Sequence, residues 1–330
     1  MQHVRLGSTG LKVSRLCLGT MTFGYQCDEP TSRAILDRAV EGGVTFIDTA
    51  DAYPVGAPPE TFGRTEEIIG TWMEGRRDRF VLATKCFFPV GPMPWDGGSS
   101  RRHILDAVHR SLRRLRTDFI DLYQLHSFDP ETPVDESLEA LDTLLRSGEV
   151  RYIGVSNWAA WRVARALGRS EVLRVGKIAS VQPRYNLLFR ELERDLLPMC
   201  ESEGLGVISY NPIAGGMLSG KHRREGGPTE GTRFTLGTSG PLYRQRYWQE
   251  AAFDAVEKLQ ALATELGIAL PTLAVAWVLH NPAITAPIIG ASRPEQLDAT
   301  LAAAEVQLDE ATLQRLDDIT HHFRYGDAER

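Results

Sequence analysis

Short apolar runs alternate with longer amphipathic segments along almost the whole chain, and this alternation limits the folds open to it. The runs occupy residues 15–19, 45–50, 80–85, 120–126, 152–157, 179–186, 206–212 and 283–290. Such near-continuous apolarity is typical of strands buried on both faces, as in a parallel sheet. Helical periodicity marks residues 31–41, 64–74, 100–116, 134–147, 193–203, 249–266 and 294–304. This strand-then-helix order predicts an α/β fold, a TIM (β/α)8 barrel.

Three pieces of the chain lie outside this pattern. Residues 4–6 and 11–14 flank a Gly-Ser-Thr-Gly turn and predict an N-terminal β-hairpin that plugs the bottom of the barrel. Residues 213–247 form a long glycine-rich loop after the seventh strand, and loops of this length are more often functional than not. Residues 271–280 and 310–323 predict extra C-terminal helices. We expect a single barrel domain over residues 1–330.

Composition excludes several classes of partner. The net charge is −6, with 37 Lys and Arg against 43 Asp and Glu and no long basic run, so we expect no nucleic-acid binding. No apolar run approaches the roughly 20 residues that span a bilayer, and the N-terminus lacks the apolar stretch of a signal peptide. We therefore expect a cytoplasmic protein without a membrane partner. Its four cysteines show no CxxC spacing and are expected to be free thiols. Monomer and homo-oligomer both remain open.

Four polar side chains stand at or just past the ends of successive predicted strands. Asp48 and Tyr53 follow the second strand, Lys85 ends the third, and His126 ends the fourth. The C-terminal ends of parallel strands meet at one mouth of a barrel, where such folds place their chemistry. We therefore expect these four side chains to converge and to form a site that donates a proton to a carbonyl.

The chemistry of the four side chains suggests a role for each. Tyr53 is the candidate acid, and a free phenol has a pKa of about 10, which is high for an acid near neutrality. A nearby ammonium stabilises the phenolate and would lower that pKa, and Lys85 is the candidate among only five lysines. Asp48 can pair with the ammonium, and His126 can hold the substrate oxygen.

Simpler explanations exist for each of these residues taken alone. Asp48 could cap a loop, Lys85 could extend its ammonium to solvent, and His126 could be a core histidine with satisfied hydrogen bonds. Their shared position at strand ends favours a joint site. A metal site formed by Asp48 and His126 is the sharper alternative, but the sequence has no HxH or HExxH motif, and a lysine in the cluster would repel a cation.

Ordered motifs along the chain resemble those of the aldo-keto reductases over nearly the whole length. The matching stretches are residues 48–53, 84–85, 121–126, 154–157, 182–183, 209–212 and 290–293. The chain is most similar in character to the aldehyde-reductase and deoxysugar-ketoreductase-like subfamilies. The resemblance implies reduction of an aldehyde or ketone by NADP(H). It also implies Tyr53 as the acid, Lys85 and Asp48 as its tuning pair, and His126 as the residue that orients the carbonyl.

The resemblance also implies where the cofactor binds. Ser156, Asn157 and Gln182 match positions that hold the nicotinamide carboxamide, and Tyr210 matches the aromatic residue that stacks on the ring. The run from Gly215 to Lys221 resembles the loop over the pyrophosphate. The remaining cofactor candidates are Gly19, Thr20, Met21, Asp48, Asn211, Pro212, Ile213, Gly216, Leu218, Gly290, Ser292, Arg293, Gln296 and Thr300.

Arg293 is the residue that points to NADP(H) rather than NAD(H). It follows the eighth predicted strand and precedes a helix N-terminus, a position that favours an anion such as the 2′-phosphate. Gln296 lies one turn further on, at the adenosine-contacting position of the family. Ala299 and Thr300 depart from the family, which commonly has an acidic residue and an asparagine there.

The substrate side of the predicted mouth is apolar. Its candidate lining residues are Met21, Phe23, Tyr25, Phe87, Phe88 and Trp95. They indicate a small-molecule aldehyde or ketone without selecting one. Two other functions remain open from the sequence: a cofactor-sensing regulatory subunit on the same scaffold, like the channel β-subunits, and a metal-dependent barrel hydrolase.

Overall fold

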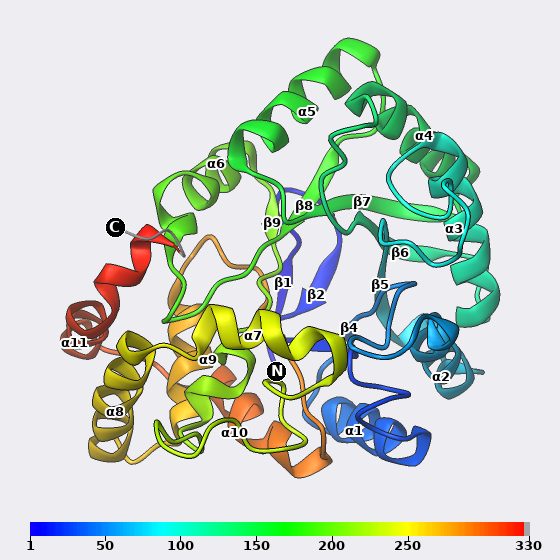
Figure 1. Cartoon of the computed structure of the whole chain (residues 1–330). Helices are drawn as coiled ribbons and strands as arrows, with labels where there is room; N and C mark the ends of the chain where they lie inside the picture. Colours follow the sequence, from blue (N-terminus) through cyan, green and yellow to red (C-terminus); the bar gives the residue numbers. More distant parts are fainter. Residues whose placement is uncertain (327–330) are drawn as a thin grey trace.

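A parallel sheet curls around the centre of the molecule in the computed structural model, which describes residues 1–326 (Figure 1). The eight strands pair in the order β10-β3-β4-β5-β6-β7-β8-β9. Backbone hydrogen bonds from Ile288 N to Ser209 O (2.7 Å) and from Thr285 N to Val207 O (2.8 Å) join the two outer strands and close the curl. The strands are β3 (Cys17–Gly19), β4 (Phe46–Asp48), β5 (Val81–Cys86), β6 (Ile120–Leu125), β7 (Val150–Ser156), β8 (Ile178–Gln182), β9 (Gly206–Val207) and β10 (Ile288–Ile289).

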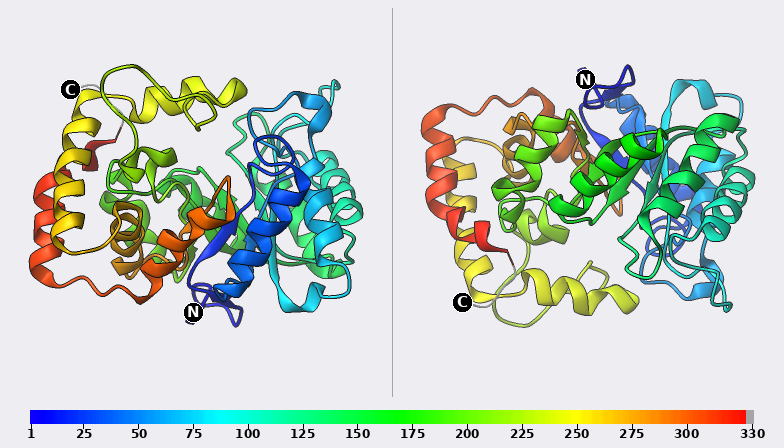
Figure 2. Two further views of the ribbon diagram at one scale, coloured as in Figure 1. Left: turned by 90° about the horizontal axis from the view of Figure 1, so that it is seen from below. Right: turned by 90° about the horizontal axis from the view of Figure 1, so that it is seen from above.

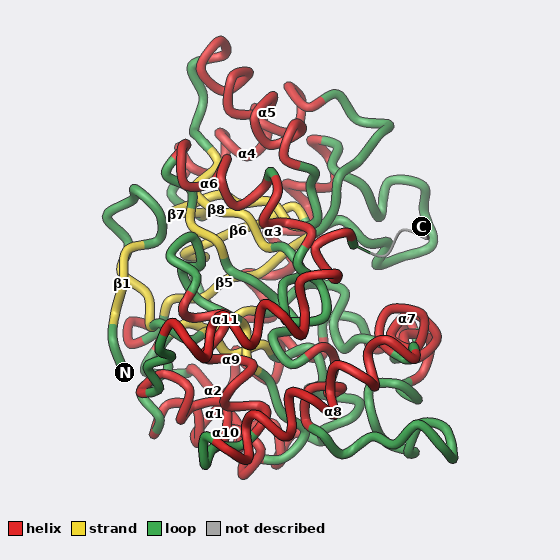
Figure 3. The backbone as a smooth tube through the Cα atoms, turned by 90° about the vertical axis from the view of Figure 1, so that its left-hand side faces the viewer, coloured by secondary structure: helices red, strands yellow, loops and turns green. Residues whose placement is uncertain are grey.

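Helices surround the strands, as Figure 3 shows in red around yellow. Their first turns carry the expected caps: Asp28 accepts from Thr31 N before α1, and Ser100 accepts from His103 N before α3. The helices are α1 (Glu29–Glu41), α2 (Arg64–Met73), α3 (Arg101–Leu115), α4 (Val134–Ser147), α5 (Ala160–Leu173), α6 (Leu196–Glu203), α7 (Gly240–Tyr247), α8 (Glu250–Glu265), α9 (Leu270–His280), α10 (Leu297–Ala302) and α11 (Glu310–Thr320). The predicted TIM barrel is thereby confirmed.

The N-terminal hairpin plugs one end of the barrel, as predicted. Its antiparallel strands are β1 (His3–Arg5) and β2 (Lys12–Ser14). Leu6 and Val13 are fully buried and pack against the interior side chains of the strands, among them Phe46. Figure 2 shows the hairpin, near the N-terminus, at one end of the molecule and α7 at the other. The C-terminal ends of the strands therefore face the α7 side, and the site is built there.

The structure differs from the predicted elements in three places. The seventh and eighth strands are regular over only two residues each, at β9 and β10. Backbone pairing continues beyond β9, from Ile208 N to Val181 O and from Tyr210 N to Pro183 O (both 2.9 Å), until Asn211 turns the chain with a φ of 59°. Pro287, directly before β10, has no N–H to donate to the sheet. Helix α5 was not predicted, because its apolar positions are interrupted by arginines and a glycine. Helix α7 lies within the expected loop 213–247.

Within residues 1–326, no single helix is long and apolar enough to cross a membrane. Helices α8 and α9 reach that length and hydropathy only when taken together, and they are bent by 94° relative to one another.

Candidate active site

A buried ion pair lies at the centre of the barrel mouth. Lys85, on β5, is fully buried, and its Nζ lies 2.5 Å from Asp48 Oδ1 and 2.7 Å from the carbonyl oxygen of Thr49. Asp48 ends β4, the strand that pairs directly with β5. The other carboxylate oxygen of Asp48 accepts hydrogen bonds from Gln182 Nε2 (2.8 Å) and Gln124 Nε2 (3.2 Å). Both charges therefore have the hydrogen-bond partners that a buried pair requires.

Tyr53 stands beside this pair, on the loop that follows β4. Its ring centroid lies 5.1 Å from Lys85 Nζ, and its side chain is largely buried. Burial raises the pKa of the phenol above its ordinary value, while the charge of Lys85 and a hydrogen bond with it act in the lowering direction. The expectation that the ammonium brings the pKa of Tyr53 below its ordinary value is therefore corrected: Lys85 lowers it as expected, but burial outweighs this effect.

The ammonium of Lys85 is retained despite its burial. Burial lowers the pKa of Lys85, but Asp48 and Tyr53 together outweigh it and raise the pKa above the ordinary lysine value. Lys85 therefore carries its positive charge at neutral pH and can act on Tyr53.

His126 completes the cluster from the end of β6. Its ring centroid lies 5.8 Å from that of Tyr53 and 4.8 Å from that of Phe88, in edge-on arrangements. Burial, and then the charge of Lys85, lower the pKa of His126 well below its ordinary value. The imidazole is therefore neutral at physiological pH. Its Nδ1 is buried and has no hydrogen-bond partner among the described residues.

Two further carboxyl groups lie behind the site, and sequence reasoning missed both. Asp51, two residues before Tyr53, is 1% exposed, and neither of its carboxyl oxygens has a partner within the described part of the chain. Burial and the neighbouring Glu66 raise the pKa of Asp51 to about 8. Glu66 is fully buried and accepts from Thr84 Oγ1 (2.6 Å) and Arg114 Nε (2.7 Å). The loop that carries the candidate acid therefore rests on a second polar cluster.

Gln124 is the other residue that sequence reasoning missed. It lies on β6, is fully buried, and donates to Asp48. The signal that could have identified it is its place in the strand: Gln124 lies two residues after Leu122, and strand residues two apart point to the same face, here the barrel interior.

The four candidates for the nicotinamide end form one hydrogen-bonded network. Tyr210 Oη donates to Asn157 Oδ1 (2.8 Å), and Asn157 Nδ2 donates to the carbonyl of His126 (3.0 Å) and to Ser156 Oγ (3.0 Å). Ser156 Oγ donates to the carbonyl oxygen of Gln182 (2.8 Å). The network thus connects through Gln182 to the Asp48 carboxylate, and it places these residues at the same mouth as the ion pair.

The glycine-rich segment after β9 turns through three successive residues with positive φ. Ala214, Gly215 and Gly216 have φ angles of 51°, 66° and 104° in a segment of 3₁₀ turns over Ala214–Ser219. A Cβ on Gly216 would meet nothing closer than 3.7 Å, so its backbone is approachable. Gly215, by contrast, packs against the ring of Tyr243.

Lys221 follows this segment in the chain, and the charge of Arg293 acts on it. Burial and the charge of Arg293 lower the pKa of Lys221. Arg293 donates to Glu295 (2.7 Å), and both of these side chains are exposed. A lysine and an arginine that repel each other at a turn of this kind are suited to hold an anion between them.

The remaining cofactor candidates fall into accessible and enclosed positions. Ser292 N and Oγ both hydrogen-bond Gln296 Oε1, at 2.9 and 3.2 Å. Thr300 is 3% exposed, and its hydroxyl donates to Leu297 O within its own helix. Gly290 is exposed, Gly19, Met21, Asn211 and Ile213 are partly buried, and Thr20, Pro212 and Leu218 are buried.

The substrate candidates also divide in two. Tyr25, Phe88 and Trp95 are exposed by 45%, 43% and 41%, and such large accessible aromatic surfaces suit an apolar ligand. Phe87 packs edge-on against Phe88 at 5.4 Å. Phe23 is fully buried within the main hydrophobic core, so its ring packs in the protein interior.

Within the described residues, no group of three or more His, Cys, Asp or Glu side chains is placed to hold a metal ion. The positive charge of Lys85 pairs with Asp48 and lowers the pKa of His126. The same charge would repel a metal ion held by these two side chains.

Comparison with known proteins agrees with this geometry. The profile of the Aldo/keto reductase family matches residues 15–321. An uncharacterized oxidoreductase of Bacillus subtilis is 43% identical over 327 residues, covering 97% of this chain and 96% of its own. A probable voltage-gated potassium channel subunit beta of Arabidopsis thaliana is 36% identical, covering 93% and 92%. The L-glyceraldehyde 3-phosphate reductase of Escherichia coli is 31% identical, covering 92% and 87%. The chain therefore belongs to the aldo/keto reductase family of oxidoreductases.

Proposed function

We propose that this protein reduces an aldehyde or ketone to the alcohol with NADPH, and that Tyr53 donates the proton. The observation that carries the proposal is the convergence of Tyr53, Lys85 and His126 on one barrel mouth, with Asp48 holding the ammonium. A hydroxyl acid, a fixed cation and a neutral imidazole are the groups that a carbonyl oxygen requires as it gains negative charge.

Each side chain has a distinct role in this proposal. Tyr53 gives its proton to the carbonyl oxygen, and Lys85 stabilises the phenolate that remains. Asp48 keeps Lys85 charged and in place through the 2.5 Å contact. His126 is neutral, so it can donate a hydrogen bond to the carbonyl oxygen without adding a second positive charge.

The residues around the mouth are suited to NADP(H). When bound, the reduced nicotinamide supplies the hydride. Ser156, Asn157 and Gln182 offer side-chain donors and acceptors for its carboxamide, and Tyr210 offers an aromatic face beside them. Lys221 and Arg293 lie close enough to repel each other and supply positive charge for the phosphates.

An NADPH-consumption screen tests the proposal directly. Aromatic aldehydes, dicarbonyls, pyridoxal and nucleotide-linked ketosugars would be offered to the purified protein, with Tyr53→Phe as the matched variant. We expect turnover with at least one class in the wild type. Tyr53→Phe should abolish it while leaving NADPH affinity within a few-fold, because only the hydroxyl is lost. A Tyr53→Phe protein that keeps most of its turnover would remove Tyr53 from the acid role.

A second candidate function is a cofactor-sensing regulatory subunit, and the similarity to a probable channel β-subunit favours it. On that alternative the protein would bind NADPH tightly but turn over slowly with every carbonyl in the screen. Fluorescence titration of NADPH beside the turnover assay separates the two functions.

A further inference from the structure

A cavity of about 340 Å³, widely open to solvent, lies on the outer side of the barrel, where α1, α2 and α3 meet. Its volume lies at the low end of the range of about 300–1,000 Å³ that is typical of small-molecule sites. None of its residues belongs to the candidate active site. Four arginines and two glutamates line it: Arg64, Arg113, Arg114, Arg116, Glu29 and Glu67.

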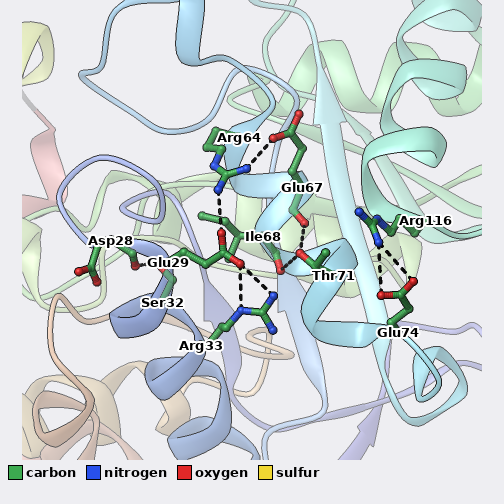
Figure 4. Close-up of polar contacts among 10 residues, drawn as sticks. All are labelled: Asp28, Glu29, Ser32, Arg33, Arg64, Glu67, Ile68, Thr71, Glu74 and Arg116. Carbon is green, nitrogen blue, oxygen red and sulfur yellow. Dashed lines mark hydrogen bonds and ion pairs between the residues drawn. The ribbon is translucent and has the colours of Figure 1, made fainter.

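Most of these charges are already paired. Arg64 donates to Glu29 (2.7 Å) and to Glu67 (2.9 Å), as Figure 4 shows, and Glu29 also accepts from Arg33. Arg116 pairs with Glu74 at 3.2 Å, on another side of the view (Figure 4). These side chains are all at least one-third exposed, so each pair is weak and can exchange its partner at little cost.

Arg113 is the exception. Among residues 1–326 it makes no ion pair, although it lines the cavity and is exposed. The lining carries four arginines and two glutamates, so positive charge is in excess there. The guanidinium of Arg113 has a planar set of donors that matches a phosphate.

We propose that this cavity binds a small phosphate-bearing metabolite, with Arg113 as its main contact to the phosphate. A phosphate monoester carries more charge than a carboxylate and offers three acceptor oxygens. It can therefore engage Arg113 and compete with Glu29, Glu67 and Glu74 for the exposed guanidinium groups of Arg64 and Arg116. The volume of about 340 Å³ leaves room for an organic part beside the phosphate.

Arg114 connects the cavity to the candidate active site. Its Nε donates to the buried Glu66 (2.7 Å), which in turn accepts from Thr84, the residue before Lys85. Its side chain also packs across Gly63, whose N–H donates to the carbonyl of Tyr53 (2.9 Å). A ligand that attracts Arg114 would weaken the ion pair between Arg114 and Glu66. The buried carboxylate of Glu66, beneath the Tyr53 loop, would then lack part of its compensating charge. An occupied cavity should therefore lower kcat.

The binding test uses calorimetry on the protein saturated with NADPH, so that Lys221 and Arg293 are already engaged. Glycerol 3-phosphate is the probe, because it carries a phosphate monoester and no carbonyl, and ionic strength is held constant with chloride. Arg113→Ala should weaken binding roughly tenfold to a hundredfold, as expected for loss of a charge-assisted contact. Arg165→Ala, which removes an exposed arginine of α5 outside the cavity, is the matched control and should bind as the wild type does.

Equal affinity of wild type and Arg113→Ala, or no binding to the wild type at millimolar probe, would overturn the proposed site. Arg114→Ala is avoided as the test variant, because it would leave Glu66 buried without its cation.

The connection to the active site has its own readout: kcat should fall with probe concentration in wild type and Arg165→Ala, and much less in Arg113→Ala. A wild-type kcat that does not change at saturating probe would overturn the connection. The calorimetric result does not depend on the proposed reduction.

Discussion

At the scale of single residues, the net effect of a charge depends on how deeply its neighbours are buried. Lys85 lowers the pKa of Tyr53, yet burial raises it by more, so the phenol stays protonated. The same burial lowers the pKa of His126 and raises that of Asp51. The barrel mouth therefore holds its groups in their neutral forms, apart from the ion pair of Lys85 with Asp48, and neutral groups are what a proton donor and a carbonyl-orienting residue require.

Lys85→Met tests how far the phenol depends on the ammonium. Burial would then act on Tyr53 without opposition, so the pKa of the phenol rises further, and Asp48 loses its ion-pair partner. We expect kcat to fall by roughly 10²–10⁴-fold, the size of a lost acid-base contribution, together with some loss of stability. Fluorescence titration identifies variants that still bind NADPH. A folded, NADPH-binding Lys85→Met protein with near wild-type kcat would show that the cluster is structural.

Asp51→Asn tests the buried carboxyl beneath the Tyr53 loop. The pKa of Asp51 is about 8 in the folded protein against an ordinary value of 3.8, so between these pH values the folded state holds a proton that the unfolded state releases. Stability therefore falls as pH rises from about 4 to about 8, by at most about 1.4 kcal/mol per unit. Asparagine removes this dependence. Urea unfolding at several pH values should show that the free energy of unfolding of the variant rises relative to that of the wild type between about pH 4 and pH 8. The same dependence on pH in both proteins would contradict the raised pKa of Asp51.

At the scale of elements, the strands position the proton-donating groups, and the loops after the last two strands carry the residues proposed for the phosphates. Strands β9 and β10 are short. The chain after β9 forms the turn at Ala214–Ser219, and the chain after β10 carries Ser292 and the positive charge of Arg293. The charges proposed for the cofactor phosphates therefore lie outside the regular strands of the sheet.

Arg293→Ala tests the proposed preference for NADPH. The lost partner would be the 2′-phosphate, so NADPH affinity should fall roughly tenfold to a hundredfold while NADH affinity changes little. Lys221→Ala is the matched control: it removes the neighbouring cation from the glycine-rich loop and should weaken both cofactors alike. Fluorescence titration of the two cofactors gives the four affinities. If Arg293→Ala weakens NADPH and NADH equally, the arginine serves the adenine or the fold instead.

At the scale of the whole molecule, the two ends of the barrel have separate tasks. The hairpin end carries Leu6 and Val13 into the interior, next to Phe46 and Leu122. The opposite end carries the ion pair and the hydrogen-bonded network, and α7 lies at that end (Figure 2). In barrels of this kind, residues of the closed end contribute to stability and those of the mouth to chemistry.

Leu6→Ala tests this separation. The side chain is fully buried, so truncation should cost about 2–5 kcal/mol of unfolding free energy, typical of a buried leucine. Below the unfolding transition, kcat and NADPH affinity should stay within a few-fold of wild type. Leu266→Ala, at a position that is 38% exposed, is the control and should cost much less. A folded Leu6→Ala protein with a strongly reduced kcat would show that the plug acts on the site.

The sequence by itself determined the order of the eight strands, most of the helices between them, and the convergence of Asp48, Tyr53, Lys85 and His126. It did so because the spacing of apolar runs is local, and because the ends of parallel strands in a closed sheet must meet. Single-domain organisation and the choice of NADP(H) stay predictions of the same kind.

Only the tertiary structure decided which side chains meet across the sheet and how much water remains around them. It brought Gln124 and Gln182 onto Asp48, enclosed Phe23 in the core and buried Asp51 where the charge of Glu66 raises its pKa. Cross-strand neighbours depend on register, and the sign of a net pKa shift depends on burial set against nearby charge. Neither quantity is encoded in the local pattern, which is why the direction of the pKa shift of Tyr53 followed from the packed barrel and not from the motif.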